Sequence, residues 1–60
     1  MFDVGTLQRT LNADTYCIAY NGDGDILFEG YYNDIPSEYY DYDVVDLWVD
    51  ESNNLCFHAE

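Results

Sequence analysis

Repulsion between like charges constrains this chain more than any motif in it. Thirteen Asp and Glu residues stand against a single cation, Arg9, in 60 residues, and the net charge is −12. Carboxylates crowded onto a small compact body repel one another and lower its stability, so globular surfaces normally intersperse both signs. A folded domain of this composition needs a reason to tolerate the repulsion.

Two alternatives would explain the acidity without a binding function. A high net charge with low hydrophobicity is typical of disordered chains, but here 48% of the residues are hydrophobic and 18% are aromatic, which supplies a large core. The surface of a halophilic protein is also acidic and poor in lysine. Halophile acidity is usually spread around the surface, whereas here many carboxylates crowd between Asp34 and Glu51. We therefore expect a folded chain with a concentrated charge.

Length and cysteine content narrow the class of protein further. Sixty residues allow one domain, 1–60, with a small core of marginal stability, so self-association into a homodimer remains open. Cys17 and Cys56 are too few for a disulfide scaffold and favour buried thiols. The N-terminus lacks the features of a signal peptide, and no segment approaches the ~20 apolar residues of a membrane span. We expect a cytoplasmic protein of a bacterial host cell that binds no membrane.

Two short helices are expected from spacing and capping signals. The apolar residues near the N-terminus recur on one helical face, which predicts a helix over residues 5–11 with Asp3 or Thr6 as its cap. Further along, Pro36 lies where a helix can begin without losing a needed N–H group. A helix of one or two turns through Tyr40 follows from that position.

Four strands are expected from alternation and turn signals. Residues 15–20 alternate in β-favouring types, the Asn-Gly-Asp-Gly segment at 21–24 suits a tight turn, and residues 25–32 return. Residues 44–50 and 55–59 form a second pair across a polar turn. The sequence therefore predicts an α+β fold: a small four-stranded antiparallel sheet of two hairpins, with a short N-terminal helix, a short helix between the hairpins, and both helices on one face.

The alternation also predicts which side chains point to solvent. The inner set, expected to face the helices, consists of Val45, Leu47, Val49, Leu55 and Phe57. The opposite face then carries Asp46, Trp48, Asp50, His58 and Glu60. Tyr and Trp are enriched at interface hot spots, although core filling is their ordinary role. The predicted partner-binding residues are Asp34, Glu38, Asp41, Asp43, Asp46, Asp50, Glu51, Tyr39, Tyr40 and Trp48.

Such a surface suits a basic groove that normally holds nucleic acid. Duplex DNA carries about one charge per 1.7 Å of axis, and its binding proteins present Lys and Arg to it. Closely spaced carboxylates would compete for that groove without offering a bond to cleave, and tyrosine rings would take the places where bases stack. The same field repels nucleic acid, so we expect no direct binding of DNA or RNA. The hypothesis is a nucleic-acid-mimicking inhibitor.

The chain resembles known proteins in layout and in composition. A leucine-bearing helix, Tyr-x-Ile-x-Tyr, Phe-Glu-Gly-Tyr-Tyr, Asp-Ile-Pro-Ser-Glu-Tyr-Tyr-Asp and Val-Val-Asp-Leu-Trp-Val-Asp make it similar to small acidic proteins of bacterial viruses and mobile elements. In composition it resembles the DNA-mimic anti-restriction and anti-CRISPR proteins, which are short, acidic and dissimilar in fold. This resemblance implies a CRISPR effector, a restriction enzyme or another basic nucleic-acid-binding host protein as the partner, and it carries over no individual residue.

Other chemistry finds weak support. If a calcium-binding loop began at Asn21, Ile26 would occupy the position that requires glycine, and Tyr32 would occupy the position of the final glutamate. Cys56 and His58 have no partner pair with zinc-site spacing. We expect no cofactor, no metal and no enzyme, since no nucleophile motif accompanies the single histidine. The alternative function is a non-catalytic interaction or assembly module, such as a homodimer, whose acidity serves solubility.

Overall fold

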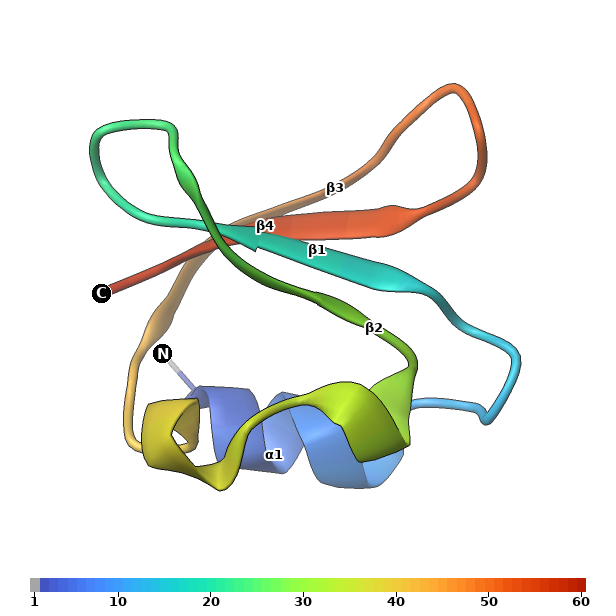
Figure 1. The fold of residues 1–60 in the computed structure, drawn as a ribbon, viewed down its shortest axis with the longest axis horizontal. Helices are drawn as coiled ribbons and strands as arrows, with labels where there is room; N and C mark the ends of the chain where they lie inside the picture. Colours follow the sequence, from blue (N-terminus) through green and yellow to red (C-terminus); the bar gives the residue numbers. More distant parts are fainter. Residues whose placement is uncertain (1) are drawn as a thin grey trace.

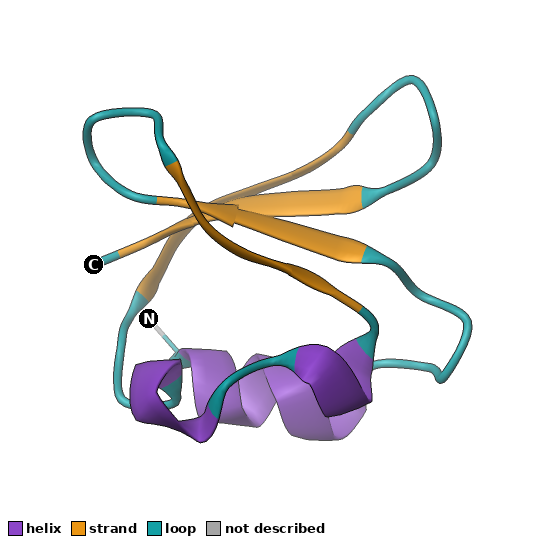
Figure 2. Cartoon of the chain, in the orientation of Figure 1, coloured by secondary structure: helices purple, strands orange, loops and turns teal. Residues whose placement is uncertain are grey.

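The computed structural model describes residues 2–60 and shows two layers, a twisted sheet and a helical layer that covers one of its faces (Figures 1 and 2). This is the α+β arrangement expected, with one α-helix at the N-terminus and a sheet of four strands. The elements in chain order are α1 Val4–Thr10, β1 Cys17–Tyr20, β2 Ile26–Gly30, the 3₁₀ turns η1 Tyr32–Asp34 and η2 Ser37–Tyr39, β3 Val44–Val49 and β4 Leu55–Ala59.

Helix α1 begins one residue before the predicted start and follows one of the two predicted caps. Asp3 is its N-cap, and the Asp3 carboxylate accepts a hydrogen bond of 2.8 Å from the backbone N–H of Thr6. Such a cap satisfies one of the N–H groups that a helix start leaves unpaired. Val4 and Leu7 on the inner side of the helix are buried against the sheet. The capping prediction is confirmed for Asp3.

The prediction of a purely antiparallel sheet is wrong. The strand order is β2-β1-β4-β3, and the two central strands, β1 and β4, run parallel. The outer pairs, β1 with β2 and β3 with β4, are antiparallel. A parallel pair needs a long crossover, and here the chain leaves β2, passes through the helical layer and enters the far edge as β3, which brings β4 back beside β1 (Figure 1).

The helix predicted from Pro36 through Tyr40 is a single 3₁₀ turn, η2, and a second 3₁₀ turn, η1, precedes it. Pro36 stands between them in an extended conformation and has no N–H to continue a helical ladder. The side chain of Asp34 instead accepts the backbone N–H of Tyr31, which closes η1 on itself. Ile35, 4% exposed, anchors the segment in the core.

A β-bulge in β3 changes which valine enters the core. The register shifts between Val44 and Asp46, so Val44 is buried at 3% exposure while Val45 is 38% exposed. The expectation that Val45 faces the helices is therefore wrong, because the bulge adds one residue and reverses the alternation. Beyond it, Leu47 pairs with Phe57 on the helical side of the sheet, as expected. Leu47 is nevertheless half exposed, so the helical layer does not cover this part of β3.

Candidate functional site

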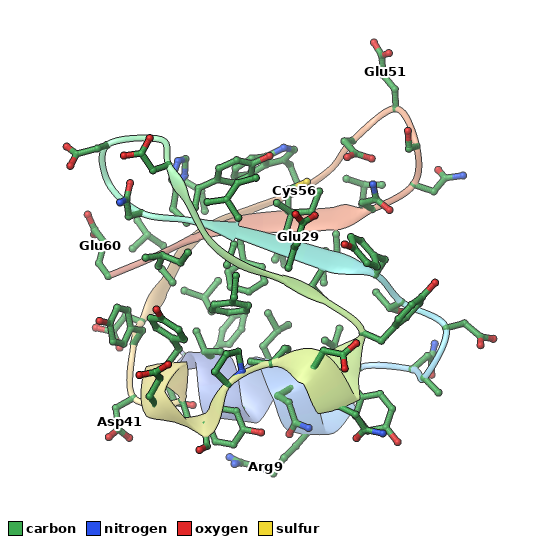
Figure 3. The ribbon with its side chains drawn as sticks, viewed as in Figure 1. Arg9, Glu29, Asp41, Glu51, Cys56 and Glu60 are labelled. Carbon is green, nitrogen blue, oxygen red and sulfur yellow. The ribbon has the colours of Figure 1, made fainter. Side chains whose placement is uncertain are left out.

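The ten residues predicted to bind a partner do not share one face. Glu38 lies in η2, within the helical layer, and Asp41 lies near that layer in Figure 3. Asp46 is on the opposite side of the sheet, because its neighbour Leu47 points to the helical side. Glu51 is at the far tip of the β3–β4 turn (Figure 3). A single partner contacting all of these residues would have to wrap around the molecule.

Asp34 and Asp50 use their carboxylates inside the fold. Asp34 accepts from the N–H of Tyr31 at 3.2 Å. Asp50 accepts from the N–H groups of Ser52 and Asn54 at 2.9 and 2.8 Å, which holds the β3–β4 turn. The backbone hydrogen bond from Asn54 is the main reason that the pKa of Asp50 is lowered below its usual 3.8. Both residues have a structural role that the sequence did not reveal.

The β1–β2 turn offers a matched comparison for Asp50. Asn21 accepts from the N–H groups two and four residues on, at 2.9 and 3.0 Å, which is the same pattern with an amide oxygen. The two turns also share a residue with positive φ at the fourth position, Gly24 at 87° and Asn53 at 64°. Asparagine is therefore a native-like replacement for Asp50 that keeps the acceptor and removes the titration.

We expect Asp50→Asn to change the pH dependence of stability with little change in structure. The pKa of Asp50 is lowered in the folded state, so its ionised form stabilises the protein above pH 3.8, and this contribution is lost as the pH falls through the folded pKa. The melting temperature of Asp50→Asn should fall slightly below that of the wild type at pH 7 and meet it once the pH has fallen below the lowered pKa of Asp50. Asp50→Ala, which lacks the acceptor, should stay below at both pH values. Melting temperatures of the wild type and Asp50→Asn that change in parallel with pH would contradict the role assigned to ionised Asp50.

The predicted aromatic residues divide between the core and the uncovered face of the sheet. Tyr39 packs on Phe28, with ring centroids 5.1 Å apart, and joins the core cluster together with Tyr40. Trp48 lies on the uncovered face, stacked on Tyr20 at 5.9 Å, and is 39% exposed. Of the three predicted aromatics, Trp48 is the one that a partner would meet most readily.

A row of carboxylates crosses one end of the sheet. Asp3 forms an isolated antiparallel bridge with Asp43. Asp43 in turn exchanges two backbone hydrogen bonds with Glu60, at 2.9 and 3.0 Å. Three acidic residues therefore stand on three adjacent backbone segments, which in a sheet are about 4.8 Å apart.

The row continues into the β1–β2 turn. The Glu60 Oε1 atom lies 3.3 Å from the point where a Cβ on Gly22 would be, so this carboxylate adjoins the turn that carries Asp23 and Asp25. Asp46 pairs with His58, which lies two residues before Glu60 and therefore on the same face of the sheet. We call this group the acidic end; it holds six of the thirteen carboxylates: Asp3, Asp23, Asp25, Asp43, Asp46 and Glu60.

Little positive charge balances the acidic end. Arg9, the only Lys or Arg of the chain, extends beneath α1 and donates to the Thr6 hydroxyl at 3.2 Å (Figure 3). The His58 Nδ1 atom lies 3.3 Å from a carboxylate oxygen of Asp46, without hydrogen-bond geometry in the described structure. The hydrogen bonds from Thr6 lower the pKa of Asp3, and the charge of Arg9 adds to them; apart from this, no Lys or Arg acts on the acidic end.

Four residues of the acidic end escaped prediction, namely Asp3, Asp23, Asp25 and Glu60. They come from the N-terminus, the first turn and the C-terminus, so no local run of charge marks them. The parallel pairing of β1 with β4 brings them together, because it places the end of β1 and its turn beside the end of β4. No local pattern in the sequence predicts this grouping, which follows from the strand order.

Within residues 2–60 the surface has no pocket, and no three His, Cys, Asp or Glu side chains gather as metal ligands would. None of the helices described there is long and apolar enough to cross a membrane. No family model, curated protein or solved structure matches the chain. The fold and the charge distribution define a small α+β protein with an acidic end.

Proposed function

We propose that this protein is a nucleic-acid-mimicking inhibitor that occupies the basic DNA- or RNA-binding site of a host defence protein, such as a CRISPR effector or a restriction enzyme. The acidic end is the observation that supports the proposal. Three of its residues, Asp3, Asp43 and Glu60, stand on adjacent backbone segments about 4.8 Å apart. This is comparable to the 3.4 Å rise per charge along one DNA strand.

The acidic end would bind a basic groove electrostatically and would not be cleaved by the enzyme that carries the groove. Lys and Arg side chains that normally neutralise phosphates would meet carboxylates instead, and a carboxylate offers no phosphodiester bond. A surface of one sign also speeds encounter with a basic partner, an effect that salt screens over ~8–10 Å. Binding should therefore be fast and strongly dependent on salt, while DNA and RNA themselves are repelled.

Competition with duplex DNA tests this function. The protein, immobilised through a C-terminal tag, would be used to capture proteins from bacteria that carry restriction or CRISPR systems, and duplex DNA would be used to elute them. Each captured protein would then be titrated with labelled duplex, with and without the inhibitor. We expect a basic nucleic-acid-binding protein that loses its duplex to the inhibitor at about 0.05–0.1 M salt and whose affinity for the inhibitor itself falls steeply as the salt concentration rises. Partners that bind duplex equally well with and without the inhibitor would refute the proposal.

Exposed apolar residues on β3 support a second candidate, an interaction or assembly module. Leu47, Trp48 and Val49 are 50%, 39% and 62% exposed, and a homodimer would bury them. In that case the charge serves solubility. Sedimentation at low and high salt separates the two functions, because a dimer present at both supports the module, whereas a monomer at both supports the inhibitor.

A further inference from the structure

Strand β3 is an edge strand whose outer side is only partly occupied. The chain's own residues 2–4 run antiparallel along its beginning: the Val44 N–H donates to the Phe2 carbonyl at 2.9 Å, and the Val4 N–H donates to the Tyr42 carbonyl at 2.8 Å. From residue 45 onward no strand of residues 2–60 pairs with this side. We call residues 45–49 the free edge. The edge therefore accepts a strand over its first part and stands open over its second.

The backbone of the free edge is directed outward at two residues. Asp50 donates its N–H to the Asn54 carbonyl at 3.0 Å, so these two residues form a hydrogen-bonded pair of the β3–β4 ladder. Hydrogen-bonded and non-hydrogen-bonded pairs alternate along an antiparallel ladder. The alternation gives Leu47 and Val49 N–H and C=O groups that point away from β4. These groups are ready to pair with an added strand.

The side chains of the free edge differ between its two faces. On the helical side, Leu47 and Val49 are 50% and 62% exposed, and they leave apolar surface beside the edge. On the uncovered side are Asp46, whose side chain is 67% exposed, and Trp48. The side chains of a strand added here would alternate between the two faces. Those on one face would lie beside Leu47 and Val49, and those on the other would lie beside Asp46 and Trp48.

We propose that the free edge binds an extended segment of a protein partner in which apolar and basic residues alternate, paired antiparallel to β3 in line with residues 2–4. Apolar side chains of that segment pack on Leu47 and Val49. Its Lys or Arg side chains pair with Asp46 and lie over the Trp48 ring, which attracts cations. This inference deepens the proposed function, on which it rests for the basic charge of the partner, and it adds the backbone contact by which the partner is held.

Charge disfavours a second copy of the chain as the occupant. Each copy carries −12, and pairing two β3 strands about Trp48 would set each Asp46 opposite an Asp50. Like charges directly opposite each other across strands are destabilising. The same charges attract a basic strand. The acidity therefore selects against self-pairing at an edge that its backbone leaves open.

Synthetic peptides test the free edge without knowledge of the natural partner. The first probe is a capped eight-residue peptide of alternating Val and Lys. The second is the same peptide N-methylated at every second residue, at the N–H groups that would face β3. N-methylation keeps the charge of the peptide and removes the backbone donors. A Val/Glu peptide of equal length is the charge control. The readouts are amide chemical shifts and hydrogen exchange of the full chain. We expect the Val/Lys peptide to slow exchange at the Leu47 and Val49 amides at least about tenfold, and the two controls to leave both amides unchanged.

Other outcomes overturn the inference. Equal effects of the Val/Lys peptide and its N-methylated form would show attraction by charge alone. Exchange at Leu47 and Val49 that slows with protein concentration in the absence of peptide would identify a second copy as the occupant. Shifts confined to the acidic end would leave the proposed function standing and remove the free edge as a contact.

Variants of the chain give an independent check. Leu47→Pro removes an N–H that faces solvent, a place where edge strands tolerate proline, and should abolish protection at Val49 by the peptide. Leu47→Thr keeps the N–H and should retain protection with weaker binding. The N-methylated peptide makes the same test on the unaltered chain, so the result does not depend on the folding of Leu47→Pro.

Discussion

Replacing Asp43 and Asp46 together by lysine is expected to abolish inhibition and leave the fold intact. Asp43 stands between Asp3 and Glu60, so a lysine there both removes the central charge of the acidic end and pairs with its two neighbours. The affinity for a basic partner should fall by about 100-fold, mostly through slower association. The melting temperature should stay the same or rise, because the substitutions relieve repulsion. Competition against labelled duplex and thermal unfolding measure the two effects.

A matched control distinguishes the acidic end from net charge alone. Asp14→Lys with Glu51→Lys changes the net charge by the same amount, but these residues lie before β1 and at the β3–β4 turn, both at the opposite end of the sheet. We expect this control to lose less than about tenfold in affinity. Equal losses in the two double variants would show that the partner responds to overall charge, and equal potency of Asp43→Lys with Asp46→Lys and the wild type would remove the acidic end from the mechanism.

Local features of the fold could be predicted from the sequence, whereas the pairing of distant segments could not. The helix cap at Asp3 and the turn at 21–24 depend on neighbouring residues, so a short stretch of sequence is enough to predict them. The parallel pairing of β1 with β4 depends on how the crossover between β2 and β3 packs. A sheet of two antiparallel hairpins would show the same alternation of apolar and polar residues, so the sequence pattern does not distinguish the two sheets. The bulge at Val45 inserts one residue, and adjacent valines at 44 and 45 leave open which of them enters the core.

The candidate site shows the same limit. Crowding of carboxylates between Asp34 and Glu51 suggested one surface, but that segment passes through both layers, and two of its members hold turns. The acidic end arises from segments more than thirty residues apart, such as Asp3 and Asp43. Composition therefore predicted the excess of negative charge, and the strand order decided where it gathers.

Gly30→Ala is expected to destabilise the protein more than any substitution at its surface. Gly30 has φ +148°, which side chains rarely adopt, and an added Cβ would lie 2.6 Å from the Asp34 Cβ. Asp34 has little freedom to move, because its carboxylate accepts the Tyr31 N–H that closes η1. Strain and overlap each cost about 1–3 kcal/mol. Their sum is a large part of the about 3–9 kcal/mol that stabilises 60 residues.

Urea unfolding of Gly30→Ala, Asp34→Gly, their double variant and a control separates the two causes. Gly22→Ala is the control, because its added Cβ would meet only the flexible end of Glu60 at 3.3 Å, and its free energy of unfolding should change by less than about 0.5 kcal/mol. Asp34→Gly loses the hydrogen bond from Tyr31 in either background, but in Gly30→Ala it also removes the overlapping Cβ. It should therefore destabilise Gly30→Ala less than it destabilises the wild type, while the strain from positive φ remains. A Gly30→Ala protein as stable as Gly22→Ala would contradict the close approach of β2 to η1.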